Sequence, residues 1–235
     1  MMDLSRRHRE DEIMDQPGLD AIEHQAALSG LGRVNWWSRT AGQIWSFLEK
    51  LRRERKLNHF RVLDLACGGG DVTLALARRA RSAGIPLTVH GWDRSTTAVA
   101  YATERSERAG LQNVEFFERD VLNDPIEQSY DVIACTLFLH HLEQDQVESL
   151  LRKMSAAKQA VIVDDLCRSR FGYLLAWFGT RILTRSPVVH TDGPLSVRAA
   201  FTTDEIEVMA KSAGLEGARI RRHWPERFSL TWVQP

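Results

Sequence analysis

Acidic residues and glycines cluster between residues 61 and 73, in the sequence RVLDLACGGGDVT. Residues 62–65 are mostly apolar and predict a buried strand, and three glycines separate this strand from a helix that begins near Asp71. Glycines let the backbone approach a ligand closely, and the first N–H groups of a helix are free to bind one. The segment therefore predicts a loop that holds a small ligand.

The spacing of the glycines distinguishes between two classes of ligand. A dinucleotide-binding loop has the pattern G-x-G-x-x-G/A after a strand. Gly68 and Gly70 match its first two glycines, but Thr73 stands at the third position. Asp71 at the helix start would repel a phosphate and tolerate a cation. S-adenosylmethionine carries a sulfonium and an ammonium and no phosphate, and Asp64 within the strand also suits it, so the loop favours this ligand over NAD.

Three later segments offer the other contacts that this ligand needs. Residues 87–93 predict a second strand that ends in Asp93, 23 residues after Gly70, and this acid can accept both hydrogen bonds of a ribose diol. Residues 114–122 predict a third strand followed by Asp120, which can accept from an adenine amino group while the N–H of Val121 meets a ring nitrogen. Residues 130–142 predict a buried strand that leads into an apolar helix start with two histidines.

Together these segments resemble the class I S-adenosylmethionine-dependent methyltransferases. The matching segments are DLACGGGD, GWDRS, ERDVL and YDVIACTLFLHHL, in the family's order, and the resemblance covers about residue 58 to the C-terminus. The family pattern is usually E/D-x-G-x-G-x-G, and Ala66 stands here at its first glycine. The resemblance implies S-adenosyl-L-methionine as cofactor, S-adenosyl-L-homocysteine as product, and this cofactor-binding set: Asp64, Ala66, Cys67, Gly68, Gly70, Asp71, Asp93, Arg94, Asp120, Val121, Thr136, Leu137 and Arg33.

Strands and helices alternate along the predicted core. Strands are expected at 60–66, 87–93, 114–118, 130–136 and 159–165, with helices at 71–83, 95–109 and 143–155 between them. Residues 203–214 predict a further helix, and residues 218–233 an antiparallel hairpin around Pro225. We therefore expect an α/β fold, with a Rossmann-like, seven-stranded, mostly parallel sheet covered by helices on both faces.

Two helical additions are expected around this sheet. Residues 1–57 predict an N-terminal helical lid segment ahead of a methyltransferase domain at 58–235; its first 15 residues are strongly charged and are expected to be loosely ordered, and helices follow at 20–31 and 33–55. The tryptophans of the second helix either pack on the core or, with Arg33, Asn35 and Trp36, close over the site. Residues 167–201 predict a cap insertion, with an apolar helix at 171–183, a turn at 192–194 and then a short helix.

Three histidines are candidates for the chemistry. Methyl transfer from a sulfonium requires the protein to align the reacting atoms, exclude water and remove a proton if the acceptor is a hydroxyl. His140 and His141 follow the fourth strand, at the edge where a parallel sheet holds its ligands, and His190 lies in the cap loop beside Asp192, which could orient it. The alternatives are that these histidines only shape the pocket or that the acceptor arrives already ionised.

Asp164 and Asp165 form a pair of acids at the end of the fifth strand. Such a pair is typical of magnesium-dependent catechol-type methyltransferases, which also need an acid just after the fourth strand. This chain has Cys135 and Thr136 there, so we expect no catalytic metal. We expect Asp165 instead to pair with an arginine, such as Arg168 or Arg198, or to contact substrate.

Composition narrows the functional class. Of 235 residues, 43% are hydrophobic and 26% are charged, which is typical of one soluble globular domain. The 31 basic and 31 acidic residues balance, so no overall field attracts nucleic acid. No apolar run is long enough to span a membrane, and the N-terminal residues do not form a secretory signal. Cys67, Cys135 and Cys167 have no metal-binding spacing, and an odd count suits a reducing cytoplasm.

The leading prediction is a methyltransferase that acts on a small, apolar, aromatic or polyketide-like acceptor, with oxygen as the favoured atom. Residues 10–19 and 186–201 resemble a bacterial subgroup that is often found beside polyketide-type enzymes. The alternatives are a carbon methyltransferase of quinone type and a protein that binds the cofactor without catalysis. A nucleic-acid methyltransferase is disfavoured because no N-P-P-Y-like segment follows the fourth strand, and a dehydrogenase because of Asp71 and Thr73. The sequence leaves the oligomeric state open, with a homodimer as one alternative.

Overall fold

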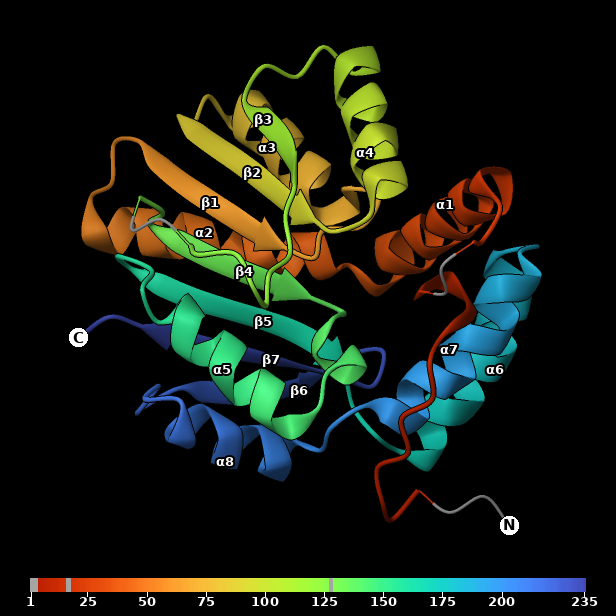
Figure 1. Ribbon diagram of the computed structural model, residues 1–235. Helices are drawn as coiled ribbons and strands as arrows, with labels where there is room; N and C mark the ends of the chain where they lie inside the picture. Colours follow the sequence, from red (N-terminus) through yellow and green to blue (C-terminus); the bar gives the residue numbers. More distant parts are fainter. Residues whose placement is uncertain (1–3, 16–17, 127–128) are drawn as a thin grey trace.

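The protein is organised around one twisted sheet (Figure 1). The computed structural model describes residues 4–15, 18–126 and 129–235. Its strands are β1 (Phe60–Leu65), β2 (Leu87–Asp93), β3 (Val114–Glu118), β4 (Val132–Thr136), β5 (Ala160–Leu166), β6 (Arg219–His223) and β7 (Arg227–Val233). Across the described chain they lie in the order β3-β2-β1-β4-β5-β7-β6, and β7 runs antiparallel to both β5 and β6. The predicted seven-stranded, mostly parallel sheet is confirmed.

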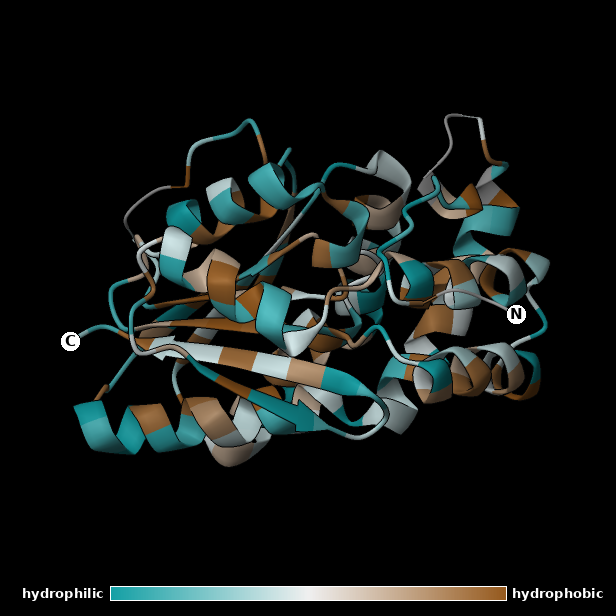
Figure 2. Cartoon of the chain, turned by 90° about the horizontal axis from the view of Figure 1, so that it is seen from below, coloured by the Kyte–Doolittle hydropathy of each residue, from teal (hydrophilic) through white to brown (hydrophobic). Residues whose placement is uncertain are grey.

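Helices cover both faces of the sheet (Figure 1). The helices α2 (Thr40–Arg55) and α3 (Asp71–Ala83) pack on one face, and α5 (Gln144–Met154) and α8 (Thr203–Ser212) on the other. Successive side chains of β1 point to opposite faces of the sheet and therefore contribute to two hydrophobic cores. Val62 is buried with α2 and α3, and Leu63 is buried with α5 and α8. Figure 2 shows the apolar residues in the central strands and the polar residues over the outer turns of the helices.

The bounds of the core elements agree with the sequence prediction to within two residues. The helix α4 (Thr96–Arg108) packs against β2 and β3. The two N-terminal helices are divided at a different point than predicted, because α1 (Ala21–Ser38) continues through Gly32 and ends at Arg39, whose φ is 58°. Gly32 does not end the helix. A Cβ there would lie 2.9 Å from Asp71 Oδ1, so this glycine lets α1 approach the start of α3.

The helices α6 (Arg170–Leu183) and α7 (Pro187–Ala199) form a hairpin beyond the carboxyl ends of the parallel strands, next to α1 (Figure 1). The predicted turn at 192–194 is wrong, because these residues lie inside α7 and Pro194 is an interior residue of that helix. Ser186 caps the helix and Pro187 occupies its first turn, which is a start signal that the prediction overlooked. Tight packing keeps α7 intact, since a Cβ on Gly193 would lie 2.7 Å from Thr180 Cγ2.

The N-terminal segment is held against the rest of the chain, so the expected loose order is wrong for residues 4–15. The Arg7 guanidinium donates to the backbone oxygens of Ala199, His140 and Leu142 at 2.6 to 2.9 Å. A short helix η1 (Ile13–Asp15) follows and donates two backbone N–H groups to the carboxylate of Asp192. Residues 16–17, part of the segment that resembles the polyketide-associated subgroup, lie outside the described residues. Across the part of the chain that the structure describes, no helix has both the length and the apolar character needed to cross a membrane.

Candidate cofactor and acceptor site

The glycine loop between β1 and α3 has the backbone geometry that its sequence predicts. Gly68 and Gly70 have φ values of 53° and 74°, in the left-handed region that favours glycine. A Cβ on Gly70 would lie 2.8 Å from Phe116 Cζ, so a side chain there would clash. Ala66 also has a positive φ, 53°, which explains why the family pattern has glycine at this position and why alanine adds about 1 kcal/mol of backbone strain. The loop is thus shaped for close approach to a ligand.

Asp64 lies beneath this loop and is fully buried. Its Oδ2 accepts a hydrogen bond from Thr73 Oγ1 at 2.5 Å, while its Oδ1 is buried and has no hydrogen-bond partner within the described residues. Burial raises the pKa of Asp64 to about 7, with smaller contributions from the negative charges of Asp93 and Asp71, although the hydrogen bond from Thr73 opposes the shift. An unsatisfied buried acceptor costs about 1–3 kcal/mol. A ligand that brings a positively charged donor to this oxygen would remove the cost.

Asp93 joins the end of β2 to the glycine loop. Its Oδ2 accepts from the backbone N–H of Gly68 at 2.8 Å, and its Oδ1 accepts from the N–H of Ser95 at 2.9 Å. A carboxylate has about four acceptor positions, so these two bonds fix its orientation and remain compatible with hydrogen bonds from a ribose diol. The structure therefore brings together Gly68 and Asp93, which are 25 residues apart in the sequence.

Asp120 lies in the turn that follows β3. Its Oδ1 accepts from the N–H of Leu122 at 2.9 Å, and its Oδ2 accepts from the side-chain amide of Asn123 at 2.7 Å. Partial burial raises the pKa of Asp120, but these hydrogen bonds and the charge of Arg94 outweigh it and lower the pKa overall. The carboxylate is thus kept ionised and oriented, with the buried Val121 beside it.

The remaining loop residue, Cys67, is not suited to nucleophilic chemistry. Its backbone N–H donates to the Trp92 oxygen at 2.9 Å, which ties the loop to β2. Burial raises the pKa of the thiol well above its usual value, with the charges of Asp64 and Asp93 acting in the same direction. A thiol with a raised pKa stays protonated and unreactive. Its role is to fill space and position the loop.

A cavity of about 230 Å³ lies between α1, α3 and α4, next to the glycine loop, where the lining residue Arg105 donates to the backbone oxygen of Gly69. Asp71 Oδ1, on its wall, accepts from the Arg105 guanidinium at 2.7 Å, so the carboxylate at the helix start is already paired. Arg33 lines the same cavity and donates from Nε to the backbone oxygen of Leu183 at 2.7 Å, which links α1 to α6. The lining residues are Ser29, Gly32, Arg33, Trp36, Asp71, Tyr101 and Arg105.

The tryptophans of the N-terminal helices differ in burial. Trp45 of α2 is buried in the core, as helix packing requires. Trp36 of α1 is 82% exposed and borders the cavity beside Asp71, so it does not pack in the core. Core packing is therefore wrong for Trp36.

The histidine pair lies just beyond β4. Leu137, at the strand end after Thr136, has a φ of 53° and donates its N–H to the oxygen of Asp164 at 2.8 Å, which turns the chain into the short helix η2 (Leu139–His141). His140 is buried, and its Nδ1 lies 2.7 Å from Asp165 Oδ1. Burial raises the pKa of Asp165, but the charge and hydrogen bond of His140 outweigh it and lower the pKa overall. Asp165 thus fixes the ring of His140.

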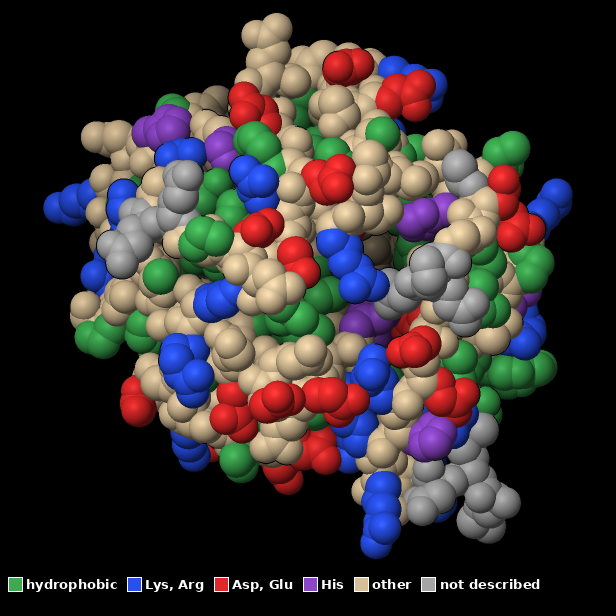
Figure 3. Space-filling view, in the orientation of Figure 1, with side chains coloured by type: hydrophobic (Ala, Val, Ile, Leu, Met, Phe, Trp, Pro, Cys, Tyr) green, Lys and Arg blue, Asp and Glu red, His purple; other side chains and the backbone are tan. Residues whose placement is uncertain are grey.

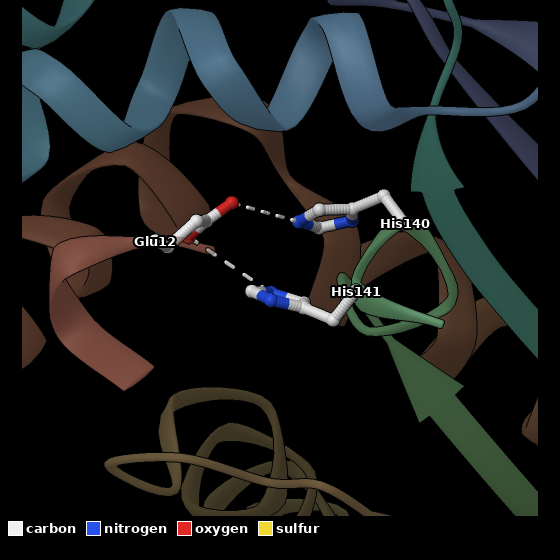
Figure 4. Close-up of side chains that lie close together, drawn as sticks. All are labelled: Glu12, His140 and His141. Carbon is white, nitrogen blue, oxygen red and sulfur yellow. Dashed lines mark ion pairs between the residues drawn. The ribbon is translucent and has the colours of Figure 1, made fainter. Parts of the chain in front are cut away.

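Glu12 joins this pair from the N-terminal segment (Figure 4). Its Oε1 lies 3.7 Å from His140 Nε2 and its Oε2 lies 4.0 Å from His141 Nε2. Ser196 of α7 donates to Oε1 at 2.5 Å and holds the carboxylate in place. Glu12 could not be recognised from the sequence, because nothing in a charged N-terminal segment reveals a contact with residues more than a hundred positions away. Figure 3 shows the surface hollowed right of its centre, with histidine side chains beside the hollow.

The arginine partners predicted for Asp165, on β5, are wrong. Successive strand residues face opposite sides of the sheet. Asp164 therefore meets His223 Nε2 at 2.7 Å and the Arg227 guanidinium at 3.6 Å, while Asp165 points to His140, so the two carboxylates do not form a pair. The arginines expected beside Asp165 bind elsewhere: Arg168 pairs with Glu205 and Arg198 with Glu10.

His190 lies on α7 and not in a loop, so that part of its prediction is wrong. Its Nε2 lies 2.9 Å from the Thr184 backbone oxygen, to which it donates. The carboxylate of Asp192, expected to orient it, accepts from the N–H groups of Ile13 and Met14 at 3.0 and 3.1 Å. His140 and His141 are thus the histidines that the structure brings together with a carboxylate from another segment.

Comparison with known proteins identifies the central part of this chain. Residues 62–159 match the family described as "Methyltransferase domain". This segment, which is less than half of the chain, is thus similar to a methyltransferase domain. The match runs from β1 to the start of β5 and includes the glycine loop, Asp93, Asp120 and the histidine pair of η2.

Relatives of the methyltransferase domain act on different acceptors, according to their names. The chain is 30% identical over 134 residues to the 2-phytyl-1,4-naphtoquinone methyltransferase of Nostoc punctiforme, covering 55% of this chain and 56% of that protein. It is 47% identical over 64 residues to a 23S rRNA (uracil(1939)-C(5))-methyltransferase of Stenotrophomonas maltophilia, covering 27% of this chain and 13% of that protein. The chain therefore spans little more than half of one relative and about an eighth of the other.

The fold extends beyond the matched domain. The crystal structure of the S-adenosylmethionine-dependent methyltransferase SibL superposes with a TM-score of 0.64 at 19% identity, covering 99% of this chain and 65% of that one. At this identity the likeness shows the fold alone. It includes the N-terminal helices and the α6–α7 hairpin within the covered part of this chain.

Proposed function

We propose that this protein transfers a methyl group from S-adenosylmethionine to a small, apolar, aromatic or polyketide-like acceptor, at oxygen. The observation that carries the cofactor assignment is the buried Oδ1 of Asp64, which lacks a donor directly beneath a loop that excludes side chains. A ligand with an ammonium group and no phosphate satisfies this oxygen. Thr73, which stands at the third glycine position of the dinucleotide pattern, disfavours a dinucleotide.

Different residues of the methyltransferase domain bind different parts of the cofactor. Asp64 and the loop from Ala66 to Gly70 hold its amino-acid end, Asp93 its ribose, and Asp120 with the Val121 N–H its adenine. Thr136 and Leu137 border it at the end of β4, and Arg33 on α1 helps to close the lid segment over it. When bound, the cofactor supplies a methyl group activated by its sulfonium.

The acceptor is placed at the histidine pair. His140 and His141 follow Thr136 and Leu137, beyond the strand end where the sulfonium would lie. Their rings, with Glu12, form a polar cluster that can hold the proton a hydroxyl loses as its oxygen is methylated. His140 is already oriented for such a role by Asp165. This cluster favours oxygen, because a carbon nucleophile of an electron-rich quinol needs less help from a base.

The kind of acceptor is argued from the surroundings of the site. The naphthoquinone methyltransferase relative acts on an apolar aromatic molecule by its name, which supports an acceptor of that kind and keeps a carbon methyltransferase as the second candidate. The balanced charge of the chain disfavours nucleic acid, and the rRNA methyltransferase shares only a short segment. All three cysteines are free thiols, which supports a reducing compartment such as the cytoplasm.

A methyl-transfer screen tests the function. The full chain is incubated with tritiated S-adenosylmethionine and panels of phenols, quinols and amines, and S-adenosylhomocysteine binding is measured by calorimetry with NAD as the comparison ligand. We expect S-adenosylhomocysteine to bind, NAD not to bind, and label to pass to phenolic hydroxyls. Binding of S-adenosylhomocysteine without methyl transfer to any compound of the panels would favour a non-catalytic protein. Methyl transfer to a ring carbon would favour the carbon methyltransferase.

A further inference from the structure

We propose that Glu12, His140 and His141 bind one divalent transition-metal ion, with Zn²⁺ as the best match to their chemistry. The three side chains come from two segments, the N-terminal coil and η2, and converge on one point (Figure 4). Their donor atoms all lie within 4.8 Å of one another. Two imidazoles and one carboxylate form a ligand set that zinc and similar ions prefer and magnesium does not.

The hydrogen bond between Asp165 and His140 fixes which ring nitrogen faces Glu12. An ionised carboxylate only accepts, so the Nδ1 of His140, 2.7 Å from Asp165 Oδ1, carries the hydrogen. The other ring nitrogen, Nε2, faces Glu12 Oε1 at 3.7 Å. Either a proton on Nε2 or a metal ion between the two groups can join them, and the metal ion also engages His141. A carboxylate that orients a histidine whose other nitrogen binds a metal is a recurrent arrangement in metalloproteins.

The donor atoms lie somewhat farther apart than they would around a bound ion. Ligands about 2.0–2.1 Å from a tetrahedral metal lie about 3.3 Å from one another. His140 Nε2 lies 3.7 Å from Oε1 of Glu12 and His141 Nε2 lies 4.0 Å from its Oε2, and the three donor atoms lie within 4.8 Å of one another, so side-chain rotations must draw them together on binding. The separation between His140 Nε2 and Glu12 Oε1 is also too long for a hydrogen bond. The gap thus fits an ion better than direct contact.

Neighbouring groups support the ligands from outside. Ser196 donates to Glu12 Oε1 at 2.5 Å, and the backbone N–H of Ile13, next to Glu12, donates to Asp192 at 3.0 Å. Glu12 and Asp165 together balance the charge of one divalent ion. The guanidinium groups of Arg7 and Arg9, which donate to the backbone oxygens of His140 and His141, oppose it, but both also pair with Glu143.

The proposed ion would deepen the function proposed above, and this part of the inference rests on that function. Three protein ligands leave at least one coordination position open, as in catalytic rather than structural zinc sites. An acceptor hydroxyl bound in that position would become more acidic. The ion would then stabilise the ionised oxygen of the acceptor, and the histidine pair would not need to hold the proton. Metal binding itself does not depend on the methyl acceptor, so the two proposals can fail separately.

Metal content tests the site directly. The full chain, with any purification tag removed, is dialysed against a chelator, titrated with Zn²⁺ by calorimetry, and analysed for bound zinc by mass spectrometry. We expect one equivalent in the wild type, and at least a tenfold weaker affinity in Glu12→Gln and in His141→Ala. His59→Ala, which removes an exposed histidine that precedes β1, is the matched control and should retain one equivalent.

Two further measurements keep the result interpretable. Circular dichroism and S-adenosylhomocysteine binding of the zinc-free variants show whether they fold. Co²⁺ in place of Zn²⁺ should give the wild type a visible absorption band, and Glu12→Gln should alter that band. Less than about 0.1 equivalent of zinc in folded wild type, or equal affinity in wild type and Glu12→Gln, overturns the proposal. Such a result with intact S-adenosylhomocysteine binding would leave the proposed function standing and reduce the cluster to a proton-binding site.

Discussion

The unsatisfied oxygen of Asp64 predicts that ligand binding depends on pH. Burial raises the pKa of Asp64 to about 7 in the ligand-free protein. About one molecule in eleven then has the carboxylate ionised at pH 6, and about ten in eleven at pH 8. An ammonium group binds the ionised form, so the affinity for S-adenosylhomocysteine should rise about tenfold from pH 6 to pH 8, or about 1.4 kcal/mol.

Calorimetry between pH 6 and pH 8.5 measures this change. In buffers with different ionisation enthalpies, binding at pH 6 should release close to one proton and binding at pH 8.5 close to none. Asp64→Asn should bind more weakly and without this pH dependence, while Asp145→Asn, at an exposed position on α5, should behave as wild type. A dissociation constant that stays level from pH 6 to pH 8 in the wild type would refute the contact between Asp64 and the ligand.

The same group affects the stability of the ligand-free protein. A folded-state pKa above the unfolded value means that the folded protein binds more protons between about pH 4 and pH 7. The contribution of Asp64 to stability is therefore fully present below about pH 4 and is lost as the pH rises through about 7. The melting temperature of the wild type minus that of Asp64→Asn should therefore decrease as the pH rises from about 4 to about 7. A difference that stays constant over this range would contradict the raised pKa.

Three further substitutions test the parts of the site separately. Asp93→Asn should weaken S-adenosylhomocysteine binding by a factor of about 10 to 100, because charged hydrogen bonds contribute about 1.5–3 kcal/mol. An unchanged affinity would contradict its ribose contact. Gly70→Ala should lower the free energy of unfolding by about 1–3 kcal/mol more than the control Gly84→Ala. Both glycines have a positive φ, but only a Cβ at position 70 would clash with a neighbour, Phe116. Equal urea midpoints for the two variants would contradict the clash. Trp36→Ala should raise the Michaelis constant with little change in melting temperature, because Trp36 is exposed beside the cavity; lower stability with an unchanged constant would reject the lid.

The core of the fold could be predicted because its signals are local. The apolar run of β1 ends at glycines that the backbone requires, and α3, β2 and β3 begin and end where the sequence predicts. The cofactor residues follow from the same pattern, since parallel strands bring Gly68 and Asp93 to one edge. Periodicity and glycine chemistry are therefore sufficient to bring together the residues that we propose for the cofactor.

The acceptor side could not be predicted in the same way, because its contacts join distant segments. Glu12 meets the histidine pair only after the N-terminal coil is held by Arg7 and by Asp192 of α7. The direction of Asp165 depends on which face of β5 it occupies, and its apparent arginine partners have carboxylates of their own. Pro194 predicts a turn from the sequence, whereas in the structure it lies inside α7, which packs on α6.

A crystal structure of the full chain grown with S-adenosylhomocysteine is the decisive test of cofactor binding at the glycine loop. We expect the amino-acid end of the ligand against the loop at Gly68, with its ammonium at Asp64 Oδ1. Its ribose should lie at Asp93 and its adenine at Asp120. An absence of the ligand at saturating concentration, or a phosphate-bearing nucleotide bound in the same loop, would contradict it.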